Sequence, residues 1–100
     1  MIKVKVEENN NYISKVTIKG HANYDELGKD IVCAAVSSIV ITTINAIEKL
    51  DKTFINHNLS KDVLTINIVK NSDVVSCLIN NMIDLLKELE SYYPKNIKIL

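Results

Sequence analysis

Apolar and polar residues alternate in short runs along this chain, and twice the alternation gives way to a long segment with helical spacing. In residues 2–6 every second residue is apolar, which is the period of a half-buried β-strand. The same period returns in residues 14–18. Three asparagines at 9–11 separate the two runs, and asparagine tolerates the left-handed backbone of tight turns. The pattern therefore predicts a β-hairpin.

The first long segment, residues 31–50, is apolar on nearly every face of a helix. A helix of this kind is typically buried on more than one side, and we expect that here. Asp30 precedes the segment. Its carboxylate can accept an otherwise unpaired backbone N–H from the first turn, so we predict that Asp30 is the helix N-cap. Many residues of the segment are β-branched and poor helix formers, and tertiary packing has to override that preference.

A second hairpin is predicted after a break at Asp51 and Lys52. Its strands are residues 53–58 and 63–69, and residues 59–62 form the turn.

A second helix follows this hairpin. Ser72 is its predicted N-cap, and Pro94 ends it because proline cannot continue a helix. Ile97 and Ile99 then indicate a short final strand. The apolar stripe of the second helix comprises Val75, Leu78, Ile79, Met82, Ile83, Leu86, Leu89 and Tyr93.

The order strand, strand, helix, strand, strand, helix, strand predicts an α+β fold. Two β-hairpins and a short final strand would form one sheet packed with two helices. The order of the strands within the sheet does not follow from the pattern. One hundred residues, of which 47% are apolar, suit a single domain over residues 1–100 with one hydrophobic core.

Twelve lysines and twelve acidic residues give a formal net charge of zero. Because the lysines are scattered along the sequence, we expect no direct binding of nucleic acid or of a membrane, although a ribosome-associated role stays open. The apolar run 31–41 is broken by two serines and is too short to span a bilayer. With two cysteines and no signal peptide at residues 1–6, we expect a cytoplasmic protein with reduced thiols.

His21 and Cys33 are the residues that suit catalysis. Cys33 is predicted near the third position of the helix, where the positive end of the helix dipole favours the reactive thiolate. His21 lies in a loop bracketed by Gly20 and Gly28 that can fold back over the start of the helix. Its imidazole could take the thiol proton and later protonate a leaving amine. Unpaired N–H groups of the first helical turn could hold an oxyanion.

Both residues also have purely structural interpretations. A single cysteine in an apolar helix is often a small core residue, and a histidine at the end of a strand is often on the surface or a satisfied core residue. Residue types and spacing alone leave the catalytic and structural interpretations open.

A longer sequence motif resembles that of a known protein family. Gly20-His21-Ala22, a short loop, Gly28, and then the run Asp-Ile-Val-Cys-Ala-Ala-Val-Ser at 30–37 resemble the ribosomal-processing cysteine protease family of bacteria. The pair Tyr93-Pro94 before the apolar residues 97–99 also matches, so the resemblance covers nearly the whole chain. It implies that Cys33 is the nucleophile and His21 the general base.

The resemblance also implies a substrate and an assembly. Members of this family remove a short N-terminal extension from large ribosomal subunit protein twenty-seven, and they cut after an aromatic residue and before a small one. They are homodimers and need no cofactor. We therefore expect a homodimeric endopeptidase whose substrate is an N-terminally extended ribosomal protein.

Asp30 and Ser37 match further positions of the family motif. Asp30 is interpreted as the helix cap with a second role in orienting His21. Ser37 follows Cys33 by one helical turn on the same face, so its hydroxyl could donate a hydrogen bond near the thiolate. A purely structural role for both residues stays open.

Residues 22–29 are predicted to form a lid over the substrate, beginning at Ala22 and hinged at Gly28. Tyr24 and Leu27 could pack on an apolar substrate segment. Two acidic residues of this loop, at 25 and 26, could attract lysines beyond the cleavage site. An ordinary solvated loop is the alternative.

His57 and Cys77 suggest other chemistry, which we consider disfavoured. Together with His21 and Cys33 they would supply four zinc ligands, but no two of them are close in sequence, so we expect no metal site. A Cys33–Cys77 disulfide is equally disfavoured. We predict that Cys77 fills the core under the second helix.

Two alternative functions stay open. A non-catalytic ribosome-assembly factor would bind the same ribosomal segment without cutting it. A thiol sensor would oxidise reversibly at Cys33 and would not depend on His21. For a homodimer, Leu85 and Tyr92 lie off the main stripe of the second helix and could form a seam.

Overall fold

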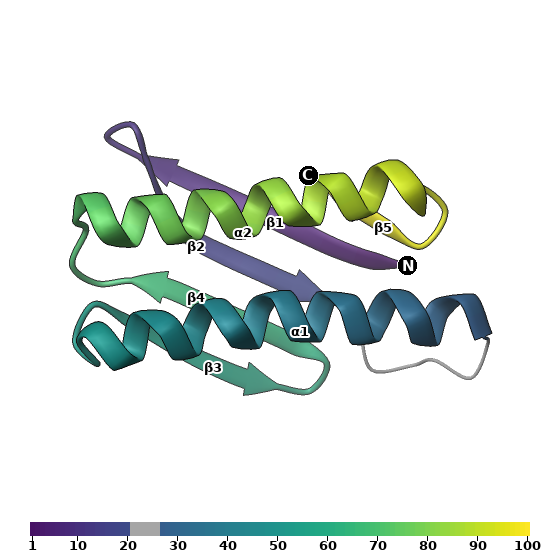
Figure 1. Ribbon diagram of the computed structural model, residues 1–100, viewed down its shortest axis with the longest axis horizontal. Helices are drawn as coiled ribbons and strands as arrows, with labels where there is room; N and C mark the ends of the chain where they lie inside the picture. Colours follow the sequence, from purple (N-terminus) through teal and green to yellow (C-terminus); the bar gives the residue numbers. More distant parts are fainter. Residues whose placement is uncertain (21–26) are drawn as a thin grey trace.

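The computed structural model describes the backbone of residues 1–20 and 27–100, and the side chains of residues 1–20 and 31–100. Its elements follow the predicted order, which confirms the α+β fold (Figure 1). Five strands and two helices are described: β1 (Ile2–Asn9), β2 (Tyr12–Lys19), α1 (Leu27–Leu50), β3 (Ile55–Ser60), β4 (Val63–Ile68), α2 (Asp73–Tyr92) and β5 (Ile97–Ile99).

The strands form one sheet in the order β3-β4-β2-β1-β5. β5 pairs parallel with β1, and the other neighbouring strands pair antiparallel. Both helices lie on the same face of this sheet, α2 over the β1 side and α1 over the β3 side (Figure 1). The result is a two-layer arrangement in which no described helix or strand covers the other face of the sheet.

Turn residues with left-handed backbone close the two hairpins. Asn10 and Asn11, between β1 and β2, have φ angles of 53° and 69°. Two consecutive positive φ angles are what a two-residue hairpin turn of the favoured twist requires, so the turn predicted at the asparagines is confirmed. Lys61, between β3 and β4, has a φ of 50°.

The hydrophobic core lies between the sheet and the two helices. α2 presents one face to it, and Ser72 caps this helix as predicted, because its hydroxyl accepts the N–H of Val75 at 3.2 Å. Fully buried side chains come from α1 (Val32, Val36, Val40, Ile47), from α2 (Val75, Ile79, Met82, Leu86) and from the strands (Ile2, Val4, Val16, Ile18, Ile66, Ile97).

α1 is buried on one side only, so the expectation of burial on several sides is wrong for the single chain. Ile31 and Ile41 are 53% and 56% exposed. The reason is the two-layer arrangement, in which α1 rests on the sheet and none of the other described elements covers its outer side (Figure 1). Residues 31–50 are long and apolar enough to span a membrane, so length alone does not exclude a span. A core helix that packs its apolar side on a sheet can have the same length and the same apolar composition as a membrane span.

The open face of the sheet carries a concentration of lysines. Lys3, Lys5, Lys15 and Lys19 border one shallow depression on it. Lys3 pairs in register with Lys19 of β2 and with Lys98 of β5. The lysines are therefore less scattered in space than along the sequence, because the exposed positions of the alternating strands all fall on this face.

Candidate active site

The backbone conformation at the end of β2 explains why the motif has a glycine at position 20. Gly20 has a φ of +85°, and a Cβ on it would lie 2.7 Å from the carbonyl oxygen of Met1. Its N–H donates to the carbonyl of Asp62 at 3.3 Å. Any larger residue would be strained here and would also clash. The end of β2 therefore requires glycine at position 20.

Several predicted site residues lie outside the described part of the chain. These are His21, Ala22 and Tyr24, together with the two acidic residues of the predicted lid. Their roles therefore stay predictions.

The helix α1 begins at Leu27, earlier than predicted. Asp30 is consequently its fourth residue and not its N-cap, so the cap prediction is wrong. Leu27 and Gly28 lie inside the helix as well, so the lid cannot extend to residue 29 and Gly28 is not a loop hinge. A glycine inside a helix costs only about 1 kcal/mol relative to alanine, which the packing of a long helix outweighs. An acidic residue in the first turn remains favourable next to the helix dipole.

Cys33 is the seventh residue of α1, in the second turn rather than the first. The N–H groups of an α-helix that lack an intrahelical partner are those of its first four residues. Amides for an oxyanion would therefore come from residues 27–30, one turn before the thiol. Cys33 itself is half-buried and lies beside the fully buried Val32. A half-buried thiol can be reached by a substrate and is shielded from much of the solvent.

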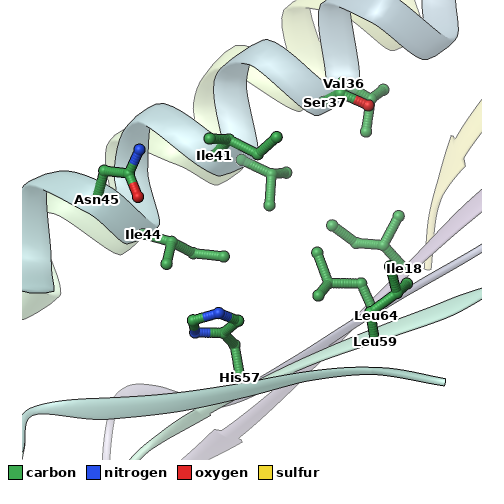
Figure 2. A pocket seen from close by; sticks show the side chains of 10 residues that line it. Ile18, Val36, Ser37, Ile41, Ile44, Asn45, His57, Leu59 and Leu64 are labelled. Carbon is green, nitrogen blue, oxygen red and sulfur yellow. The ribbon is translucent and has the colours of Figure 1, made fainter. Parts of the chain in front are cut away.

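Ser37 follows Cys33 by one turn and is half-buried at the border of an apolar groove between α1 and the β3–β4 hairpin (Figure 2). The groove has a volume of about 310 Å³. Side chains of α1 face those of three strands across it. The lining residues are Val36, Ser37, Val40, Ile41, Ile44 and Asn45 of α1, with Ile18, His57, Leu59 and Leu64 of the strands.

The sequence indicated Ser37 but not the rest of this groove. Its walls are far apart in sequence and come together only through the order β3-β4-β2 in the sheet. A possible signal was the alternation of His57 and Leu59 on one face of β3, since both point toward the helix (Figure 2).

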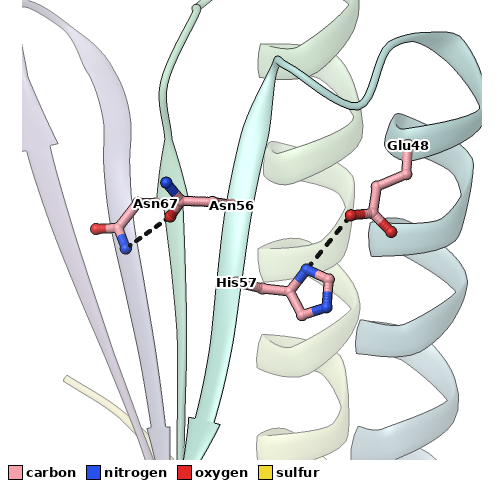
Figure 3. Close-up of polar contacts among 4 residues, drawn as sticks. All are labelled: Glu48, Asn56, His57 and Asn67. Atoms are coloured by element: carbon pink, nitrogen blue, oxygen red, sulfur yellow. Dashed lines mark hydrogen bonds and ion pairs between the residues drawn. The ribbon is translucent and has the colours of Figure 1, made fainter.

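His57 lies at the far end of the groove from Cys33. Its Nδ1 is 3.5 Å from a carboxylate oxygen of Glu48 (Figure 3). Fifteen residues of α1 separate Cys33 from Glu48, which is about 22 Å along a helix. His57 is therefore out of reach of the thiol. The chain has two histidines, so only His21 is left as a histidine base for Cys33.

Cys77 lies on α2 and is exposed, so the prediction that it fills the core is wrong. It falls on the polar side of α2, between the buried positions Val75 and Ile79. It is a free thiol, which argues against a disulfide with Cys33. Among the described residues no three histidine, cysteine, aspartate or glutamate side chains gather as metal ligands would. Leu85 and Tyr92 are exposed at 40% and 71%, but whether they meet a second copy stays a prediction.

Comparisons with known proteins agree on one family. The family model described as cysteine protease Prp matches residues 1–98. The ribosomal processing cysteine protease Prp of Staphylococcus aureus is 31% identical over 90 residues, which cover 87% of this chain and 85% of that protein.

Two crystal structures of Staphylococcus aureus Prp share the fold. The structure with a substrate peptide matches with a TM-score of 0.92 and 29% identity, covering 100% of this chain and 98% of that one. The structure with a covalently linked product peptide gives a TM-score of 0.87 and 30% identity, over 99% and 97% of the two chains. With the motif, the fold and the whole length in agreement, the chain belongs to the Prp family of ribosomal processing cysteine proteases.

Proposed function

We propose that this protein is a Cys-His endopeptidase with Cys33 as nucleophile and His21 as general base. His21 takes the proton of the Cys33 thiol, and the thiolate attacks the carbonyl carbon of the scissile peptide bond. The protonated imidazole then gives its proton to the leaving amine, and an acyl-thioester remains on Cys33. A water molecule, deprotonated by His21, hydrolyses the thioester and releases the carboxylate product and the thiol.

The observation that carries this proposal is the place of Cys33 on α1. It is half-buried, one helical turn before Ser37, and Ser37 borders the apolar groove. The second histidine of the chain is held beside Glu48 at the other end. The covalently linked product peptide in a relative of the same fold supports a covalent mechanism.

The proposed substrate is the N-terminal extension of large ribosomal subunit protein twenty-seven, cut after an aromatic residue and before a small one. The relatives are named for ribosomal processing, and an apolar groove that begins one helical turn from Cys33 suits an apolar residue near the cut. Asp30 and Ser37 are proposed to support the catalytic pair, and Ala22, Tyr24, Leu27 and Gly28 to contact the substrate.

We also propose that the protein acts as a homodimer in the cytoplasm without a cofactor. Exposed apolar side chains on both helices, Ile31 and Ile41 on α1 and Leu85 and Tyr92 on α2, support an interface with a second copy. Light scattering after gel filtration measures the mass directly, and a monomer at micromolar concentration would contradict this part of the proposal.

The test of the proposed activity uses a synthetic peptide with an apolar, aromatic-ended segment followed by a lysine-rich segment. Wild-type protein in reducing buffer should yield two fragments by mass spectrometry, whereas Cys33→Ala and His21→Ala should leave the peptide intact. An intact peptide that binds wild type and Cys33→Ala equally would favour the non-catalytic assembly factor. Cleavage that survives His21→Ala would remove His21 from the mechanism.

A further inference from the structure

The open face of the sheet, opposite the two helices (Figure 1), gathers lysines from three neighbouring strands. Lys3 of β1 pairs in register with Lys19 of β2 on one side and with Lys98 of β5 on the other. Residues that pair in register share a face of the sheet, and neighbouring strands are about 4.8 Å apart. The Cα atoms of the three lysines therefore form one row across the sheet that spans about 10 Å.

Two more lysines extend this row along the strands. Lys5 and Lys15 border the same shallow depression as Lys3 and Lys19. Lys5 follows Lys3 by two residues on β1, which is about 7 Å along a strand. Among the described residues that line the depression, the acidic one is Glu7, and it pairs in register with Lys15. With Lys98 of the row, the open face thus carries five lysines and one glutamate.

This arrangement of charges is unfavourable for the folded chain on its own. Like charges directly opposite each other on neighbouring strands are destabilising. The ion pair found among the described residues joins His57 to Glu48 on the helix side of the sheet, so no described carboxylate neutralises the five lysines at ion-pair distance. The turn beside the row adds Lys61 and Asp62, whose charges cancel. Lysines that repel one another and have no acidic partner in the described chain suit an anionic ligand.

The acidic residues are concentrated in the other layer of the molecule. α2 carries Asp73, Asp84, Glu88 and Glu90, and its single lysine is Lys87. The formal net charge of zero therefore combines a basic sheet face with an acidic helix on the opposite side. Such a separation of charge orients the protein toward a polyanion, with α2 turned away from it. The expectation of no nucleic-acid binding rested on lysines scattered along the sequence, and the fold removes that premise.

The composition of the depression favours the phosphates of a duplex over other anions. Among the described residues that line it, none is aromatic, so an unpaired base has no side chain on which to stack. Leu100 is the large apolar residue of the lining, whereas binding to a membrane surface needs a broad apolar face. A second copy of the same face would bring lysines against lysines. Thr17 also borders the depression and pairs with Thr65, and a threonine hydroxyl can bond to a ribose 2′-hydroxyl.

We propose that the open face binds the phosphate backbone of duplex RNA through Lys3, Lys5, Lys15, Lys19 and Lys98. The polyanion site rests on these lysines alone, and the choice of RNA rests on the proposed function, whose substrate is a ribosomal protein. Lys19 is the last residue of β2 and precedes His21 by two residues. RNA on this face would therefore hold a protein attached to that RNA close to the segment that carries the proposed general base.

The first test measures the binding of a fluorescein-labelled RNA duplex of about 16 base pairs by fluorescence polarisation. The row variant Lys3→Gln/Lys19→Gln/Lys98→Gln is compared with the control Lys49→Gln/Lys52→Gln/Lys87→Gln, which removes the same charge from exposed lysines on or next to the helices. At about 50 mM salt we expect Kd to rise about tenfold or more in the row variant and less than about threefold in the control. Equal losses in both variants, or no binding by wild type, would overturn the proposal.

The salt dependence gives an independent measure of the contacts. Each lysine that neutralises a phosphate contributes about 1 to the slope of log K against log salt. We therefore expect the row variant to lower the slope by about 2–3, and Lys5→Gln and Lys15→Gln to lower it by about 1 each. An unchanged slope in these variants would mean that the lysines do not contact the phosphates, and would overturn the proposal.

A charge-preserving variant guards against loss of the fold. Lys3→Arg/Lys19→Arg/Lys98→Arg keeps the three positive charges and should bind the duplex within about threefold of wild type. The glutamine row variant should unfold at or above the temperature of wild type, because opposed like charges are removed. Loss of duplex binding in the arginine variant as well would show that charge is not what binds, and would overturn the proposal.

Unlabelled competitors identify the anion. They are the same RNA duplex, a DNA duplex of the same sequence, polyglutamate of equal charge, and vesicles of phosphatidylcholine and phosphatidylserine in equal parts. The RNA duplex should displace the labelled probe at the lowest concentration of charge. Stronger displacement by DNA, by polyglutamate or by the vesicles would assign the face to DNA, an acidic protein or a membrane, and would overturn the choice of RNA.

These measurements separate RNA binding from the proposed protease activity. Cys33→Ala should bind the duplex as wild type does, and the row variant should cleave the free synthetic peptide within about twofold of wild type. If the peptide stays intact but the duplex binds in a lysine-dependent way, the protease proposal fails and the lysine site stands. If the peptide is cleaved but the duplex does not bind, only the RNA proposal fails.

Discussion

The two helices lie side by side on one face of the sheet, but they use their apolar residues differently. In α2 a single stripe is buried and the opposite side is mostly polar, as in an ordinary surface helix. In α1 the buried stripe is accompanied by the exposed Ile31 and Ile41 and by the residues of the groove. α2 thus completes the core of its own chain, whereas α1 has apolar residues beyond what that core uses.

This surplus of apolar residues lies on the helix that carries the proposed nucleophile. Cys33 lies on α1, and Ser37 and Ile41 continue from it along the groove. A helix that only had to complete the core would carry polar residues in place of the exposed Ile31 and Ile41, since exposed apolar surface promotes association. Both helices therefore contribute to the core, and the additional apolar residues of α1 accompany the proposed nucleophile. The predictions below test this difference between the helices.

The largest expected difference is in the activity of the alanine variants of the two cysteines. Cys33→Ala removes the proposed nucleophile, so we expect kcat/KM to fall by about 10³-fold or more. Cys77→Ala changes an exposed residue of α2, and we expect activity within about twofold of wild type. Peptide cleavage measured by mass spectrometry under identical conditions decides this. Comparable losses in the two variants would contradict the assignment of chemistry to α1.

The second prediction concerns two neighbouring leucines of α2. Leu86 is fully buried and Leu85 is 40% exposed. Leu86→Ala should lower the free energy of unfolding by about 2–5 kcal/mol, because it leaves a cavity in the core, whereas Leu85→Ala should change it by less than about 1 kcal/mol. Urea unfolding followed by circular dichroism measures both. If Leu85→Ala were the more damaging change in a dimeric sample, this face of α2 would belong to the dimer interface.

The contrast between α2 and α1 also explains which features of the fold could be predicted from the sequence. The stripe of α2, its cap at Ser72 and the existence of the two hairpins follow from local periodicity and turn chemistry, and the structure confirms them. The bounds of the second hairpin were predicted wrongly, because Leu59 and Ser60 pair with β4 and leave only residues 61 and 62 for the turn. The start of α1 does not follow, because Gly28 resembles a loop residue locally and only packing of the whole helix outweighs its cost.

The groove and the order of the strands depend on contacts between distant segments, which periodicity does not encode. His57 and Leu59 meet α1 only because β3 occupies one edge of the sheet. The pairing of His21 with Cys33 was predicted from the motif, and it stays a prediction because His21 lies outside the described residues.

The third prediction compares the starts of the two helices. Ser72→Ala removes the hydroxyl that accepts the N–H of Val75 and should lower the free energy of unfolding by about 1 kcal/mol, while Ser72→Gly should cost only a few tenths of a kcal/mol. Asp30 lies inside α1, so Asp30→Ala should cost only the smaller interaction with the helix dipole, about 0.3–1 kcal/mol. Thermal unfolding of the three variants checks the order. A loss in Asp30→Ala larger than that in Ser72→Ala would restore the capping role of Asp30.

The smallest expected effect lies at the other end of α1, where Asp51 follows the last helical residue. Hydrogen bonds from the hydroxyl and the backbone N–H of Thr53, at 2.6 Å and 2.8 Å, hold the pKa of the Asp51 carboxyl below its ordinary value of 3.8, with a further contribution from the charge of Lys70. Because the folded-state pKa is the lower one, the stabilisation is fully present above pH 3.8 and is lost as the pH falls through the lowered pKa. Thr53→Ala removes the hydroxyl bond, so the pKa of Asp51 should rise toward 3.8 in a carboxyl carbon NMR titration. An unchanged titration would mean that the hydroxyl does not contribute, and that the turn after α1 is held by its backbone bonds alone.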